Sequence, residues 1–331
     1  MRSFLKFFLL LSLLLAALAA AAVWWANAPI ALREATVDFR ITPKSSLRSA
    51  AAQMQEAGVG INADLLALLA RWQGVATGIK AGSYSVKQGI TPDQLLTKLA
   101  RGDVTQGEVL LVEGWTFRQW RARLEQHPDL KHETLGLSEA EIAARLGIDG
   151  GKLEGWLLPD TYLFDKQSSD IELLARAHRA MKRKLDLAWR EREPGLPYKT
   201  PYEALIMASI VEKETGRSDD RALVAGVFVN RLRKGMLLQT DPTVIYGLGE
   251  TFDGNLRKRD LQTDTPYNTY TRSGLPPTPV AMPGLASIQA ALHPAANDML
   301  YFVARGDGSS HFSRTLDEHN KAVGKYQKGS K

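Results

Sequence analysis

Residues 202–215 read Tyr-Glu-Ala-Leu-Ile-Met-Ala-Ser-Ile-Val-Glu-Lys-Glu-Thr, and Gly216 follows them. The stretch contains no helix breaker, and its apolar residues cover a helix on almost every side, which indicates burial on most of its surface. Gly216 is placed where a left-handed C-terminal cap would end the helix. The sequence therefore predicts a buried helix in a mainly helical C-terminal domain.

Two glutamates, Glu212 and Glu214, lie near the end of this predicted helix. Ionising a carboxyl beside an apolar helix is costly, and the negative end of the helix dipole adds to that cost, so we expect a raised pKa. A glutamate in that state can donate a proton near neutral pH. The two side chains point about 200° apart around the helix, so both candidates stay open. A pair of ordinary surface carboxylates is the alternative.

The residues after this helix predict a second helix and then long loops. An amphipathic helix is expected from Arg221 to about Lys234, and a proline-rich stretch at 265–279 also carries Tyr, Asn and Thr. So much proline excludes central strands and helix interiors. Aromatic rings, amides and hydroxyls on loops suit a carbohydrate ligand, because rings stack on sugar faces. Well-packed surface loops are the alternative.

The residues between Val37 and about His127 repeat a strand-then-helix pattern three times. Two of the helices open with Thr-x-x-Gln, which predicts capping boxes. Such short units predict a small mixed module, of the LysM kind in an exported chain, with a spacer domain as the alternative. The expected strands are 37–41, 83–86 and 109–112, and the expected helices are 46–57, 92–99 and 117–126.

The N-terminus predicts a membrane anchor. Arg2 and Lys6 precede an apolar run from Phe7 to Trp25, which as a helix would span about 28 Å, enough for a bilayer core. Because the basic residues lie on the N-terminal side, we expect a cytoplasmic N-terminus and an exported bulk at the cell inner membrane. An uncleaved anchor is favoured over a signal peptide, whose cleavage the alanine-rich part of the run would permit.

These patterns give an α+β fold class with a single N-terminal transmembrane helix, a small LysM-like βα module and a mainly helical catalytic domain with long loops. We predict a cytoplasmic tip and anchor at 1–27 and the LysM-like module at 35–127. A helical connecting region follows at 128–200, interrupted by a compact Gly-Trp-Pro loop at 154–162. The predicted catalytic domain occupies 201–331.

The composition of the 331 residues excludes several classes of site. The chain has no cysteine, so disulfides, thiolate nucleophiles and Cys-ligated zinc are excluded. Its six histidines are scattered, and it contains neither a phosphate-cradling glycine loop nor a serine-hydrolase elbow, so we expect no metal and no cofactor. A net charge of +6 suits an anionic partner without selecting one, and we expect no nucleic acid.

Four blocks, 154–162, 208–215, 227–247 and 264–283, resemble the endolytic murein transglycosylase family, also called MltG or YceG-like. The similarity covers nearly the whole chain, with Leu158 standing where a Phe is more usual. The motifs are Ala-Ser-Ile-Val-Glu-Lys-Glu-Thr, Asn230-Arg231-Leu232, Gln-Thr-Asp-Pro-Thr, Tyr-Asn-Thr-Tyr running into Gly-Leu-Pro-Pro, and a tail with His311-Phe312-Ser313, Thr315 and Glu318-His319.

The resemblance implies a lytic transglycosylase, a carbon–oxygen lyase acting on polysaccharide, with Glu212 as catalytic acid and base. It implies cleavage of the β-1,4 bond between N-acetylmuramic acid and N-acetylglucosamine in nascent peptidoglycan strands, which leaves a 1,6-anhydro end and terminates elongation. Peptidoglycan synthases at the membrane are the implied partners. We predict that eight further residues bind substrate: Glu154, Asn230, Gln239, Thr240, Asp241, Tyr246, Asn268 and Tyr270.

A single glutamate without a paired carboxylate would suit that chemistry. As an acid it protonates the leaving oxygen, and as a base it activates the sugar's own 6-hydroxyl, which has the advantage of proximity. A two-carboxylate hydrolase must instead activate water or form a covalent adduct. Two alternatives stay open: a peptidoglycan-binding scaffold without activity, and a pyridoxal-phosphate lyase, against which the expected export and the lack of a phosphate cradle argue.

Overall fold

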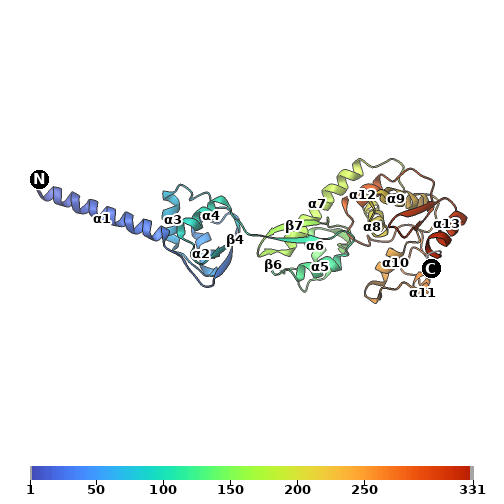
Figure 1. Ribbon diagram of the computed structural model, residues 1–331, viewed down its shortest axis with the longest axis horizontal. Helices are drawn as coiled ribbons and strands as arrows, with labels where there is room; N and C mark the ends of the chain where they lie inside the picture. The colour runs from blue at the N-terminus through green and yellow to red at the C-terminus, as the bar shows by residue number, and fades with distance from the viewer. Residues whose placement is uncertain (1, 329–331) are drawn as a thin grey trace. The chain divides into compact units, whose positions relative to one another are not determined.

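The computed structural model describes residues 2–328 of the chain, which divide into two compact units (Figure 1). Unit 1 holds Met1–Glu108 with two short segments that return to it, Asp129–Lys131 and Leu163–Ser168. Unit 2 holds the rest of the chain. Residue 1 of the predicted anchor and residues 329–331 of the predicted catalytic domain lie outside the described residues.

The predicted N-terminal helix is confirmed as α1, Arg2–Asn27. Within it, the 22 residues Lys6–Asn27 contain an 18-residue window with a mean hydropathy of 2.5, and no residue of that window is buried. Among the described residues this is the one helix long and apolar enough to cross a membrane. Its length and composition therefore fit a single-pass anchor.

Unit 1 is a small mixed layer of helices on antiparallel strand pairs. β2 (Thr36–Ile41) pairs with β4 (Gly82–Lys87), and the inward side chains of β2 are buried. The predicted strands, the helix expected at 46–57 and the capping box at Thr91 are confirmed, and Ser46 caps the first of these helices. The remaining elements of the unit are β1 (Ala31–Leu32), α2 (Leu47–Ala57), β3 (Val59–Gly60), α3 (Ala63–Trp72) and α4 (Pro92–Arg101).

The third predicted strand–helix unit lies mostly in unit 2. β5 (Gln106–Leu111) and α5 (Phe117–Glu125) form as expected, with a capping box at Thr116. The division between the units falls within β5, whereas the predicted module ends at residue 127. The indole of Trp120 is fully buried and donates to the Val112 carbonyl, so α5 packs inside unit 2. A local strand–helix pattern does not specify which neighbours bury it.

Unit 2 is mainly helical. Its longer helices are α7, α8 and α9, and α12 packs against both α8 and α9 in one apolar core. The elements from β6 onward are β6 (Leu130–Lys131), α6 (Glu139–Leu146), η1 (Asp149–Gly151), β7 (Asp160–Asp165), β8 (Ser168–Ser169), α7 (Asp170–Arg190), α8 (Pro201–Glu214), α9 (Ser218–Arg233), α10 (Asp241–Leu248), η2 (Gly249–Thr251), α11 (Lys258–Gln262), α12 (Leu285–Leu292), β9 (Tyr301–Ala304), β10 (Ser310–Ser313), α13 (Leu316–Val323) and η3 (Gly324–Lys328).

The helix predicted at 202–215 is confirmed as α8, and every residue from Ala204 to Val211 is buried. The predicted left-handed cap at Gly216 is wrong. The helix instead ends at Thr215 in an extended conformation with φ of −145°, and Gly216 does not have a positive φ. Only three residues separate α8 from α9, and the chain leaves α8 through the extended Thr215. The predicted loop at 265–279 is confirmed.

Candidate active site

One face of α8 lies along the loop segment 280–284. The Val280 amide donates to the Ser209 hydroxyl at 2.9 Å, and the Gly284 amide donates to Oε2 of Glu212 at 2.9 Å. Ser209 and Glu212 are three residues apart and so share a helix face. These two hydrogen bonds fix the half-buried Glu212 carboxylate at the N-terminal end of α12.

A second glutamate, Glu113, lies against the same glycine. The Gly114 amide donates to the Met282 carbonyl at 2.8 Å, and the Met282 amide donates to the Trp115 carbonyl at 2.8 Å. This pairing brings the Glu113 carboxylate so close to Gly284 that a Cβ there would overlap it. The expectation of an unpaired catalytic glutamate is therefore wrong, because Glu113 and Glu212 both contact Gly284.

The charges around the pair are mixed. Burial, followed by the charge of Glu212, raises the pKa of Glu113, and Arg221 acts in the opposite direction. Lys213 Nζ donates to the Gly114 carbonyl at 3.2 Å, so a second cation lies on the same side of α8. Since two ionised carboxylates beside one glycine repel each other, the arrangement favours keeping one proton on the pair.

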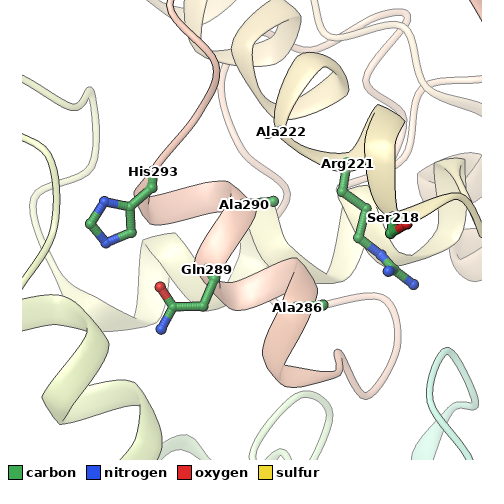
Figure 2. A pocket seen from close by; sticks show the side chains of 7 residues that line it. All are labelled: Ser218, Arg221, Ala222, Ala286, Gln289, Ala290 and His293. Carbon is green, nitrogen blue, oxygen red and sulfur yellow. The ribbon is translucent and has the colours of Figure 1, made fainter.

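An open concavity of about 250 Å³ lies between the start of α9 and α12 (Figure 2). Arg221 and Ser218 come from α9, and the α12 residues begin at Ala286, two positions after Gly284. Nε of Arg221 is buried without a hydrogen-bond partner among the described residues. The lining residues are Ser218, Arg221, Ala222, Ala286, Gln289, Ala290 and His293. The lining includes neither Glu113 nor Glu212, and Arg221 connects the concavity to the pair because its charge acts on Glu113.

Glu214 faces a different environment from Glu212. The Thr240 hydroxyl donates to Glu214 Oε1, and the Tyr270 hydroxyl donates to Asp241 Oδ1 at 2.5 Å. Burial raises the pKa of Glu214 to about 7, against the opposing effect of the Thr240 hydrogen bond. Three of the predicted substrate-binding residues, Thr240, Asp241 and Tyr270, are therefore gathered around Glu214.

Three other predicted substrate-binding residues make hydrogen bonds within the chain. Nδ2 of Asn230 donates to the Asn297 carbonyl at 2.9 Å, and the Gln239 amide donates to the Thr269 carbonyl at 3.1 Å. Asn268 is fully buried, and its Nδ2 donates to the Thr263 carbonyl at 2.7 Å. These groups fix the loops between α9 and α12, and their contact with substrate stays a prediction.

The last two predicted residues, the buried Glu154 and the half-buried Tyr246, form a hydrogen-bonded pair. Both carboxylate oxygens of Glu154 accept from the Phe117 amide, at 3.1 and 3.2 Å, at the start of α5. The Tyr246 hydroxyl also hydrogen-bonds to Glu154. Burial raises the pKa of Glu154 to about 8. Glu154 therefore ties α5 to α10, and its role toward substrate is untested.

The functional candidate that sequence reasoning missed is Glu113. Its signal is positional, because Glu113 and Gly114 directly follow a predicted strand and precede the capping box at Thr116. Gly114 adopts φ of 72°, a turn conformation that glycine adopts without strain. A carboxylate at the end of a strand, next to such a turn, is a candidate site residue, but the sequence does not show that it contacts Gly284.

A carboxylate pair at the start of α12, beside a buried helix, is compatible with acid–base chemistry, and sequence comparison specifies the family. The chain belongs to the YceG-like family, whose profile matches residues 39–325. It is 33% identical over 310 residues to the endolytic murein transglycosylase of Bacillus subtilis (strain 168), which covers 88% of this chain and 85% of that protein.

Two further relatives agree with that assignment. The endolytic murein transglycosylase of Streptococcus pneumoniae (strain ATCC BAA-255 / R6) is 30% identical over 317 residues, covering 85% of this chain and 57% of the relative, so the chain spans little more than half of that protein. A crystal structure of a YceG-like protein from Listeria monocytogenes shares 31% identity at a TM-score of 0.54. It covers 87% of this chain and 98% of that one.

Proposed function

We propose that this protein is an endolytic murein transglycosylase, a lyase that cuts the glycan strands of peptidoglycan. Relatives of that name share 29–33% identity over most of the chain, and the family is established by the match over residues 39–325. The observation that carries the chemical proposal is the placement of Glu212, a half-buried carboxylate held by the Gly284 amide next to Glu113.

In the proposed mechanism Glu212 first acts as an acid. It transfers its proton to the oxygen that joins N-acetylmuramic acid to N-acetylglucosamine, and the bond from C1 to that oxygen breaks. The 6-hydroxyl of the same N-acetylmuramic acid then bonds to C1 and returns its proton to the Glu212 carboxylate. The products are a 1,6-anhydro end and a free 4-hydroxyl, and no water is consumed.

The neighbours of Glu212 support this cycle in two ways. The Gly284 amide holds one carboxylate oxygen in place, so the other can approach the substrate without a large entropy cost. Glu113 places a second acidic group beside the first, which opposes the loss of the last proton from the pair as pH rises. We assign Glu113 a positioning role.

A pair of carboxylates also permits a hydrolase, and the products distinguish the two reactions. Hydrolysis adds one water to the cut strand, whereas the transglycosylase reaction leaves the anhydro ring. We expect mass spectrometry of purified glycan strands treated with the full-length protein to detect fragments several disaccharides long that carry anhydro ends. Reducing ends without the anhydro ring would contradict the proposed chemistry.

The active-site assignment is tested by Glu212→Gln beside its matched control Glu214→Gln. Both variants remove one carboxyl from the same turn of α8, so a general disturbance of the helix would affect both. We expect anhydro products to disappear with Glu212→Gln and to persist with Glu214→Gln. If neither the parent nor the variants cut the strands while all of them bind, the chain is a peptidoglycan-binding scaffold.

The setting of the enzyme is also proposed. α1 anchors the chain in the inner membrane with its N-terminus in the cytoplasm, and the two units lie on the outer side. Unit 1 serves as a LysM-like module that binds peptidoglycan, and peptidoglycan synthases are partners that supply nascent strands. Protease protection in membrane vesicles of known orientation tests the topology. Protease added to the outer face of the membrane should cleave the chain after α1 and leave the N-terminus intact.

A further inference from the structure

Apart from α1, exposed large apolar side chains gather on one helix of unit 1. On α3, the exposed fractions are 42% for Leu65, 63% for Leu68 and 79% for Trp72. Single exposed apolar residues are ordinary on protein surfaces, whereas three on one short helix are not. Elsewhere in the described chain outside α1, such side chains occur one to an element or loop, at Leu110, Leu135, Leu163, Leu187, Leu285 and Leu316.

The three side chains share one face of α3. They follow one another at spacings of three and four residues, which places them on the same side of a helix. A different face of α3 buries Leu66 and Leu69 in the core of unit 1. The exposed face is therefore not part of that core, and within the described residues no other segment covers it.

α1 ends inside the core that α3 helps to build. Ala26, in the last turn of α1, is buried in the same apolar cluster as Leu66 and Leu69, and Trp25 packs against that cluster. The apolar, uncovered part of α1 continues up to Trp24, which is 74% exposed. No flexible linker separates the membrane-crossing segment from unit 1, so the core of the unit begins where the membrane ends.

We propose that the face formed by Leu65, Leu68 and Trp72 lies in the outer interface of the membrane that α1 crosses. The inference rests on the proposed membrane anchor. Tryptophan concentrates at the interface between membrane and water, and the side chain of the exposed Arg71, which precedes Trp72 on α3, is long enough to reach lipid headgroups. Lipid is the occupant that the chain itself brings to this face, because α1 and α3 share one core.

This second membrane contact would limit how unit 1 tilts on its anchor. A single helix lets the attached domain lean in any direction, whereas a helix and a neighbouring interfacial face together define an orientation. Unit 1 would then rest on the membrane with its α3 side and leave its other surfaces for glycan.

The natural absence of cysteine allows a direct test in the full-length chain. Single substitutions Leu68→Cys and Trp72→Cys are labelled with a nitroxide, and the protein is placed in nanodiscs of phosphatidylcholine with phosphatidylglycerol. Collision with oxygen, which concentrates in lipid, is compared with collision with a water-soluble nickel chelate. Leu14→Cys on α1 reports on the anchor, and Glu56→Cys on α2 is the exposed polar control.

We expect labels at positions 68 and 72 to favour oxygen over nickel several-fold more than the label at 56, and less than the label at 14. Labels at 68 and 72 that behave like the one at 56 would overturn the membrane contact while leaving the anchor intact. Labels at 68 and 72 that are shielded from both oxygen and nickel would also overturn the membrane contact, since that result indicates that a protein partner or a second copy of the chain covers this face. A nickel-accessible label at 14 would overturn the anchor itself.

Discussion

Glu212 and Glu214 differ in what surrounds them, although they are two residues apart on the same helix. Glu214 accepts the Thr240 hydroxyl, next to a group of residues that hydrogen-bond to one another, and burial raises its pKa to about 7. Glu212 accepts one backbone amide, faces a second carboxylate and lies near an open concavity. A raised pKa alone therefore does not identify a catalytic acid.

The comparison separates two uses of a carboxyl group. On the Glu214 side the carboxyl is one member of a closed polar network that connects α8 to the start of α10. On the Glu212 side the protein leaves one carboxylate oxygen without a hydrogen bond among the described residues. An acid that must give its proton to a substrate needs the second arrangement, because the substrate has to reach it.

The largest expected effect is the loss of activity in Glu212→Gln. An amide cannot exchange the proton, so we expect the rate of anhydro-product formation to fall by about 10³-fold. Glu214→Gln should keep most of the activity, since an amide can still accept the Thr240 hydroxyl. Mass spectrometry compares the rates of anhydro-product formation by the parent and the two variants. Thermal denaturation shows whether each variant is folded. A reversed pattern would assign the acid to Glu214.

The second expected effect comes from Gly284→Ala. The backbone at Gly284, with φ of −75°, accepts alanine. The three atoms nearest to the new Cβ all belong to the Glu113 carboxylate, which the Cβ must displace. We expect activity to fall by about 10²-fold, because the carboxylate pair loses its geometry while the fold remains. The rate of glycan-strand cleavage, measured at saturating and at limiting substrate concentrations, gives the loss of activity.

Gly216→Ala is the matched control for that substitution. A Cβ at Gly216 meets nothing within 4 Å. Gly216 lies in the short connection between α8 and α9, two residues after Glu214. We expect parental activity from this variant. Equal losses in both alanine variants would show that the effect does not depend on Glu113.

The local parts of the site could be predicted from the sequence. α8 follows from its apolar residues and the lack of a breaker, and the capping box at Thr116 follows from a four-residue motif. The opposite directions of Glu212 and Glu214 follow from helical periodicity, and the structure confirms them. Each of these features depends on residues within a few positions of one another.

The parts that could not be predicted depend on distant contacts. Glu113 meets Glu212 only because Gly114 and Trp115 pair with Met282, in a loop that has no periodic pattern to read. The cap at Gly216 was wrong because a glycine after a helix permits a left-handed turn without requiring one. The helix α3, with its amphipathic pattern and Asn62 cap, was not predicted although its signals are local.

A smaller effect is expected from Glu113→Gln, which keeps the shape of the pair and removes its second acid. The raised pKa of Glu113, caused in part by the charge of Glu212, shows that the two carboxylates repel each other, and the amide removes this repulsion. We expect the alkaline limb of the pH–rate profile to move to lower pH. A purely structural role for Glu113 would lower the rate without moving the limb.

The smallest expected effect is on the Glu214 side and concerns stability rather than rate. The folded protein holds the Glu214 proton up to a pKa of about 7, whereas the ordinary value is 4.5, so this carboxyl stabilises the fold fully below pH 4.5. That contribution is lost as pH rises through about 7.

We expect the thermal midpoint of the parent to fall by a few °C between pH 5 and pH 8, and Glu214→Gln to lack part of that fall. Glu154, whose pKa is raised to about 8, supplies a similar fall that remains in the variant. Identical pH dependence in the parent and in Glu214→Gln would mean that the Glu214 carboxyl is not sheltered from water, and the contrast between the two sides of α8 would then rest on their partners alone.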